Sequence, residues 1–161
     1  MRRPSFRSSG IAPIGSHGMY FAVITQNLLA CRRRASSFTL RCSSNGIEDR
    51  IEELALAGAQ VARQVADDFS TDEKPRYVLG SVGPGTKLPS LGHEKFSVLR
   101  DAYQKQTVGL LNGGVDAILI ETAQDLLQAK SAVIGAKRAM KTLDVYVPII
   151  VSVTIETTGT M

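Results

Sequence analysis

The segment from Val115 to Ile120 constrains the fold of this chain more than any other. It reads Val-Asp-Ala-Ile-Leu-Ile and is almost wholly apolar, which is typical of a strand buried on both faces of a parallel sheet. Parallel strands must be joined by long crossover connections, usually helices. The sequence therefore predicts an α/β fold in which helices precede and follow this strand.

Helical and strand-like patterns alternate along the chain from Glu48 onward. Apolar residues at spacings of three and four predict helices over Ile51–Phe69, Lys95–Asn112 and Gln124–Lys141. Strand-like segments lie at Arg76–Leu79, Val115–Ile120 and Val147–Ile155. The order α–β–α–β–α–β predicts about three parallel strands with crossover helices.

The apolar spacing also predicts which helix faces are buried. In the first helix the expected inward stripe is Ile51, Leu54, Gly58, Val61, Val65 and Phe69. In the third helix the expected inward residues are Leu126, Leu127, Val133 and Ile134. Both an open doubly wound sheet and part of a (β/α)8 barrel satisfy this pattern, and both place functional groups at the C-terminal ends of strands.

A glycine-rich segment, Gly80–His93, follows the first predicted strand. It contains four Gly and two Pro in 14 residues, so we predict a loop, and loops of this length are often functional. Its glycines match neither the dinucleotide-binding fingerprint nor the phosphate-binding P-loop. An α/β enzyme that holds phosphate in this loop is nevertheless one interpretation that the residues alone leave open.

Residues 1–47 differ in composition from the rest, with seven Arg and no acidic residue. This favours disorder, a mis-joined reading frame, an organelle transit peptide or a secretion signal. The apolar run Met19–Ala30 is too short and too polar to span a bilayer. The basic charge belongs to this segment, and no basic stripe with aromatic residues follows it, so neither a nucleic acid nor a membrane is a predicted partner. Cys31 and Cys42, the only cysteines, fit no zinc motif.

Three stretches of the sequence resemble a known family: GSVGPGTKLPSLGH, LRDAYQKQTVGLLNGGVDAILIETAQDLLQAKSAVIGAKRAM and VPIIVSVTIETTGTM. Together with NGIEDRIEELALAGAQVARQVADDFST they resemble the homocysteine-binding domain of cobalamin-dependent methionine synthases, in the homocysteine S-methyltransferase family. The similarity covers Asn45–Met161, with the pattern ILIET-x-x-D-x-x-x-A-K after GG-x-D as its most specific part. Residues 1–44 match nothing in it, which predicts two regions, 1–44 (disordered or targeting-like) and 45–161 (part of the barrel domain).

The resemblance implies a partial (β/α)8 barrel and a parent reaction that transfers a methyl group from methylcobalamin to zinc-bound homocysteine, giving methionine. In the family, zinc is held by cysteines of Asn-Cys and Gly-Cys-Cys-Gly segments. This chain contains neither segment, and Cys31 and Cys42 lie on the wrong side of the match. We therefore expect no catalytic residue, no metal ligand and no bound cofactor in the chain itself, with zinc and cobalamin belonging to the full-length parent.

The resemblance also implies that Glu121 contacts the amino group of homocysteine. The residues agree, because Ala117, Leu119 and Glu121 share one face of their strand and Glu121 lies at its end. Capping of the next helix is the structural alternative. Ser81, in the glycine-rich segment, is the second candidate substrate-binding residue, with turn formation as its alternative.

The expected partners are homocysteine and the remaining domains of the parent protein. The expected compartment is the cytoplasm, with organelle targeting by residues 1–44 as the alternative. A truncated non-catalytic product, or a small amino-acid-binding module without metal, is the competing interpretation of the whole chain.

Overall fold

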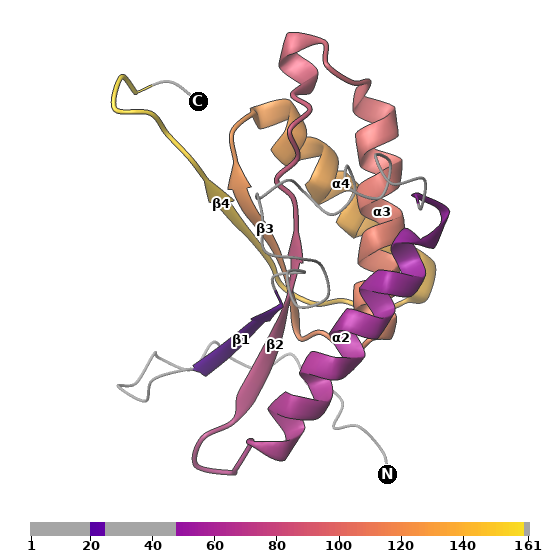
Figure 1. Cartoon of the computed structure of the whole chain (residues 1–161), viewed down its shortest axis with the longest axis vertical. Helices are drawn as coiled ribbons and strands as arrows, with labels where there is room; N and C mark the ends of the chain where they lie inside the picture. Colours follow the sequence, from indigo (N-terminus) through magenta and orange to yellow (C-terminus); the bar gives the residue numbers. More distant parts are fainter. Residues whose placement is uncertain (1–19, 25–47, 160–161) are drawn as a thin grey trace.

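The computed structural model describes residues 20–24 and 48–159 (Figure 1). Its four-stranded parallel sheet has the order β1-β2-β3-β4. The strands are β1 (Tyr20–Ile24), β2 (Arg76–Val82), β3 (Ala117–Ala123) and β4 (Ile149–Val153). The helices are α2 (Ile51–Asp68), α3 (Phe96–Asn112) and α4 (Leu126–Leu143), with short 3-10 turns η1 (Glu48–Arg50) and η2 (Pro89–Leu91).

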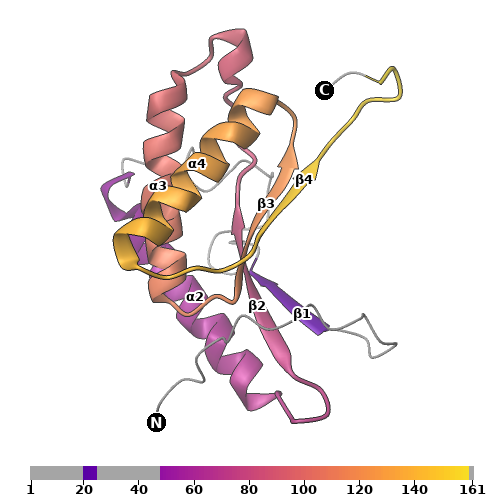
Figure 2. The same ribbon diagram turned by 180° about the vertical axis from the view of Figure 1, so that it is seen from behind.

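All three α-helices lie on one side of the sheet (Figures 1 and 2). The strands also follow one another in chain order across the sheet. Right-handed crossovers place every helix on the same side when the strand order runs in one direction, whereas a doubly wound sheet needs a reversal of that order. Of the two arrangements that the sequence left open, the described residues have the one-sided arrangement, which consecutive units of a βα barrel share.

The predicted α/β class, the parallel strands and the crossover helices are confirmed, with shifted element ends. The first predicted strand stops at Leu79, but β2 continues to Val82 and pairs with β3 along Gly80–Val82. Glycine weakens a strand on propensity. Here the small size of Gly80 leaves room for Leu110 and Val115, whose side chains approach within 3.1–3.3 Å of the place that a Cβ atom would occupy.

Strand β1 is an addition to the predicted elements. It pairs in parallel with β2 in the register Tyr20↔Arg76 to Ile24↔Gly80 and lies inside the segment 1–44 for which the composition favoured disorder or targeting. The missed signal is a short run of aromatic and β-branched residues, which is typical of strands. The remainder of the segment lies outside the described residues, and so do Cys31 and Cys42.

The predicted inward face of α2 is confirmed at Ile51, which is buried, but is wrong further along the helix. Val61 and Phe69 are 57% and 69% exposed, whereas the buried residues are Ile51, Ala55, Ala59 and Ala66. Alanines are selected because α2 and α3 approach closely: Cβ atoms added to Gly109 and Gly113 of α3 would lie 2.9 and 2.2 Å from the Cβ atoms of Ala55 and Ala59. Larger side chains do not fit between such close helix backbones.

The predicted inward face of α4 is confirmed only in part. Leu126 and Leu127 are exposed, whereas Val133 and Ile134 are half-buried and Val133 packs against the core. The buried face instead consists mainly of small residues: Gln128, Ala129, Ser131, Ala132, Gly135, Ala136, Ala139 and Met140. The core between helices and sheet is completed from β2, β3 and α3 by Val78, Val82, Ile118, Ile120, Leu99, Tyr103 and Leu110.

Candidate functional site

The side chains of β2 alternate between the helices and the opposite face of the sheet. Val78 and Val82 are fully buried in the core cluster, and a Cβ atom on Gly80 would point at α3. By the two-residue period of a strand, Ser81 points to the face without helices. Ser81 is nevertheless buried, at 5% exposure.

Strand β3 has the same alternation. Ile118 and Ile120 are buried in the core beneath the helices, so Leu119 and Glu121 point to the opposite face, where both are half-buried. Ser81 pairs with Leu119 in the register of the two strands. Ser81 and Glu121 therefore lie on the same face of neighbouring strands, both toward the C-terminal ends, where parallel α/β proteins bind ligands.

The strand is irregular directly after Glu121. The pairing with β4 shifts register between Ile120 and Ala123, and Thr122 has a φ of 53°, a value that a β-branched residue rarely adopts. Bulges of this kind redirect side chains and occur often beside functional sites. The irregularity thus includes Glu121 and Thr122.

Asp125 joins two parts of this edge of the sheet. Its Oδ1 atom accepts hydrogen bonds from the N–H groups of Leu127 and Gln128, at 2.6 and 3.1 Å, and so caps α4. Its Oδ2 atom accepts from the N–H of Ser90 at 2.9 Å and from the Ser90 hydroxyl. The sequence indicates a place for Asp125 in the first turn of the helix because of its charge, but the side chain also holds the loop after β2.

These contacts determine how Asp125 titrates. Burial of its side chain acts to raise the pKa, but hydrogen bonds from Ser90 and from the first turn of α4 outweigh burial and lower the pKa below its ordinary value of 3.8. A carboxyl group whose pKa is lower in the folded state stabilises the fold above its unfolded pKa. That stabilisation is lost as the pH falls through the folded pKa.

We therefore expect the substitution Asp125→Asn to lower the free energy of unfolding by about 1–2 kcal/mol at neutral pH. The difference from the wild type should shrink as the pH falls from 3.8 through the lower pKa of the folded state, because the wild-type carboxyl group is protonated in both states only below that pKa. Urea unfolding of both proteins across this pH range measures the gap. A difference in free energy of unfolding that stays constant at acidic pH would contradict a lowered pKa for Asp125.

A pocket of about 280 Å³ lies beside the Ser90–Asp125 contact. It is lined by Leu88, Ser90, Leu91, Gln124, Thr154 and Glu156, which come from the loop after β2 and from the chain after β3 and β4. Ser81 and Glu121 do not line it. Ser81 and Glu121 thus lie on neighbouring strands, whereas this pocket is formed by the segments that follow the strands.

Two other polar residues singled out in the sequence have structural contacts. His93, to which no catalytic role is assigned, accepts a hydrogen bond at Nδ1 from the Leu88 N–H at 3.3 Å. Asp116, interpreted as a turn residue, accepts hydrogen bonds at Oδ2 from Arg63 at 2.7 Å and from the Val78 N–H at 2.6 Å. It lies at the opposite end of the strands from Glu121.

Neither a metal centre nor a membrane-spanning helix occurs in the described part of the chain. Among residues 20–24 and 48–159, no group of three or more His, Cys, Asp or Glu side chains is placed to hold a metal ion. Within the same ranges, none of the helices is both long enough and apolar enough to cross a bilayer.

Comparison with known proteins gives consistent matches. The family model described as homocysteine S-methyltransferase matches residues 17–161. Over 115 residues the chain is 55% identical to methionine synthase of Mycobacterium tuberculosis (strain ATCC 25618 / H37Rv) and to methionine synthase of Mycobacterium leprae (strain TN). Each alignment covers 71% of this chain and 10% of the relative, so the chain spans about a tenth of the length of these relatives.

The family match corrects one expectation. The motifs in the sequence predict no family similarity before Asn45, whereas the match begins at residue 17 and so includes β1. The predicted limit is too narrow because the earlier residues carry none of the specific motifs on which the resemblance depends.

Proposed function

The chain belongs to the homocysteine S-methyltransferase family, and from this premise we propose that it forms part of a (β/α)8 barrel that binds homocysteine. The one-sided arrangement of helices and the strand order support the barrel. The parent reaction is methyl transfer to the homocysteine sulfur, giving methionine. Homocysteine and the other domains of the longer parent protein are the proposed partners, and the cytoplasm is the proposed compartment.

The position of Glu121 is the observation that carries the proposal. Its side chain lies on the free face of the sheet at the C-terminal end of β3, and it is half-buried. A carboxylate there suits the ammonium group of an amino acid, because a charge-assisted hydrogen bond in a partly desolvated site is stronger than one between neutral groups. Ser81, on the same face of the neighbouring strand, offers a hydroxyl group that can donate to the substrate carboxylate or accept from the ammonium.

Zinc and cobalamin, which the family implies, belong to the longer parent protein in this proposal. The described residues do not fit a zinc site, because they hold no cluster of metal-ligand side chains and no cysteine. The role that we assign to them therefore involves neither group. It is to bind and orient the amino-acid end of homocysteine.

Two other interpretations receive less support. A truncated non-catalytic product, or a small amino-acid-binding module without metal, is not favoured, because the family model for homocysteine S-methyltransferases matches residues 17–161. A phosphate-binding enzyme built on the glycine-rich segment predicts N–H groups directed at a ligand. In the structure Gly80–Val82 belong to β2, and the later loop is held by side chains that cap or belong to α4.

The substitution Glu121→Gln tests the proposal. We expect it to weaken homocysteine binding by about tenfold to a hundredfold, since hydrogen bonds to charged groups contribute about 1.5–3 kcal/mol. Calorimetric titration of wild type and variant with homocysteine gives the dissociation constants. 4-Mercaptobutanoic acid, which lacks the amino group, should bind both proteins equally weakly.

The matched control is Glu156→Gln, which removes a carboxylate from the neighbouring strand end and the adjacent pocket. It should leave homocysteine binding within about twofold of the wild type, because surface polar substitutions have small effects. If Glu156→Gln weakens binding and Glu121→Gln does not, the ammonium group lies in the pocket and the assignment of Glu121 is wrong.

A further inference from the structure

Buried polar side chains of two helices hold the end of β2 and the loop between β2 and α3. Gln106 of α3 donates from Nε2 to the carbonyl oxygen of Ser81 at 3.1 Å. Gln128 of α4 donates from Nε2 to the carbonyl oxygens of Gly85 and Lys87, at 3.2 and 3.3 Å. Beyond the turn η2, this segment has no regular secondary structure that would satisfy its backbone groups.

The polar side chains that make these contacts are buried. Gln106 and Gln128 are each 2% exposed and Asp125 is 4% exposed. Burying polar groups at this depth is unfavourable unless they form hydrogen bonds. Around Gln128, the buried face of α4 is otherwise mainly small and apolar. The contacts of Gln106 Nε2, Gln128 Nε2 and the Asp125 carboxylate satisfy these groups, whereas the buried Oε1 atom of Gln128 has no hydrogen-bond partner in the described part of the chain.

Asp125 occupies a special place among the three. The loop that contains Ser90 follows the strand of Ser81, and Asp125 follows Glu121 by four residues. The contact between Ser90 and Asp125 thus ties together the two strand ends that carry the proposed substrate contacts. Ser90 also lines the adjacent pocket, as does Gln124, the residue before Asp125.

We propose that Asp125 is a positioning residue for the homocysteine site: Oδ1 caps α4, while Oδ2 latches Ser90 and so fixes the loop beside Ser81 and Glu121. The inference rests on the proposed function for its link to homocysteine, but the latch itself rests only on geometry. The two oxygen atoms have separate partners, so the capping role and the latching role can be separated by mutation.

Asp125→Asn is the separating variant. Asparagine caps helices about as well as aspartate, but with its oxygen on the helix its amide NH2 group cannot accept the hydrogen bonds of Ser90. Ser90→Ala removes the hydroxyl from the other side, and Ser90→Thr keeps it. Asp144→Asn is the matched control, since Asp144 is an exposed aspartate in the left-handed conformation at the other end of α4, a conformation that asparagine also tolerates.

The experiment uses the full 161-residue chain. Amide hydrogen exchange by mass spectrometry reports on the loop and on α4 separately, and calorimetry gives the dissociation constant for homocysteine. We expect both Asp125→Asn and Ser90→Ala to speed exchange in peptides covering residues 83–92 by about tenfold, without change in α4, and to weaken homocysteine binding about fivefold. Ser90→Thr and Asp144→Asn should behave as the wild type, and the double variant should be no weaker than the single ones.

Three results would overturn the inference. The first is unchanged loop exchange in both latch variants, and the second is faster exchange in α4 of Asp125→Asn, which would make Asp125 a helix cap alone. The third is a faster loop with unchanged homocysteine affinity while Glu121→Gln still weakens binding. If instead Glu121→Gln has no effect but the latch variants loosen the loop, the latch stands and the proposed function fails.

Discussion

The substitution Gly109→Ala is expected to destabilise the protein by about 2 kcal/mol or more, although it replaces glycine inside a helix. On propensity alone alanine would gain up to about 1 kcal/mol. At this position the added Cβ would lie 2.3 Å from the carbonyl oxygen of Glu52 and 3.0 Å from the backbone N of Leu56. Both are backbone atoms of α2, so relief requires the whole helix to move, and overpacking of this kind typically costs about 1–3 kcal/mol.

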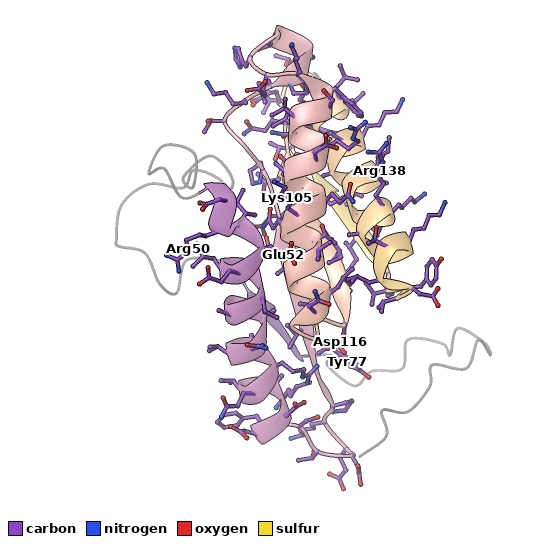
Figure 3. The ribbon with its side chains drawn as sticks, turned by 90° about the vertical axis from the view of Figure 1, so that its right-hand side faces the viewer. Arg50, Glu52, Tyr77, Lys105, Asp116 and Arg138 are labelled. Atoms are coloured by element: carbon purple, nitrogen blue, oxygen red, sulfur yellow. The ribbon has the colours of Figure 1, made fainter. Side chains whose placement is uncertain are left out.

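The measurement is thermal and urea unfolding of the variant against the wild type. A loss of about 2 kcal/mol corresponds to a fall in melting temperature of roughly 8 °C for a domain of this size. Figure 3 shows α2 beside α3 and labels Glu52. The substitution leaves every candidate site residue unchanged, so the loss reports helix packing alone.

Gly58→Ala provides the matched control in the facing helix. Gly58 lies within α2, and nothing lies within 4 Å of the place that its Cβ would occupy. Here only helix propensity acts, and we expect the protein to be stabilised by about 0.5–1 kcal/mol. Equal effects of the two substitutions would show that α2 and α3 are not packed as closely as the structure has them.

The same contact explains why the helix faces predicted from the sequence are partly wrong. Periodicity identifies the helices correctly, because their apolar residues recur at helical spacing. The face depends on a pairing: Ala55 and Ala59 are buried only because Gly109 and Gly113 face them from a segment about fifty residues later. Hydrophobicity ranks Val61 and Phe69 above alanine, so a pattern read along one helix selects the exposed face.

The candidate site divides in a similar way. The position of Glu121 on the free face follows from strand alternation, which is a local property. The latch between Asp125 and Ser90 joins residues 35 positions apart, so no local sequence pattern predicts it. From the sequence, Asp125 is only a favourable charge at a helix start. The sequence predicts that the Asp125 carboxylate interacts with the start of the helix, but it does not predict that the second oxygen atom binds Ser90.

Substitution of Asp116 by alanine is expected to cost about 2–3 kcal/mol of stability. Its Oδ2 atom accepts from Arg63 of α2 and from the N–H of fully buried Val78, and its own N–H donates to the Val78 carbonyl at 2.8 Å. Removal of the carboxylate takes a partner from a buried N–H and from a partly buried guanidinium, and each loss costs about 1–3 kcal/mol. Figure 3 labels Asp116 beside Tyr77, the residue before Val78.

Asp67→Asn controls for the charge of Arg63. Asp67 pairs with the same guanidinium at 2.8 Å, but its side chain is 65% exposed, and exposed pairs contribute little. We expect a loss below about 0.5 kcal/mol in urea unfolding. A loss as large as that of Asp116→Ala would mean that the charge on Arg63, and not the bridge to the sheet, sets the stability.

The two carboxylates at opposite ends of β3 should therefore separate stability from binding. Asp116 precedes the strand, at the end of a parallel sheet where side chains support the fold, and Glu121 lies toward the other end, where ligands bind. At a temperature where both variants remain folded, Asp116→Ala should keep the homocysteine affinity of the wild type within about twofold. Glu121→Gln should lose affinity without loss of melting temperature, because the Glu121 carboxylate is half-buried and its removal strands no buried donor among the described residues. Asp116→Ala could instead weaken homocysteine binding as much as Glu121→Gln does. That result would mean that the pairing register of β2 and β3 positions the ligand contacts, so that stability and binding are not separated between the two ends of the strand.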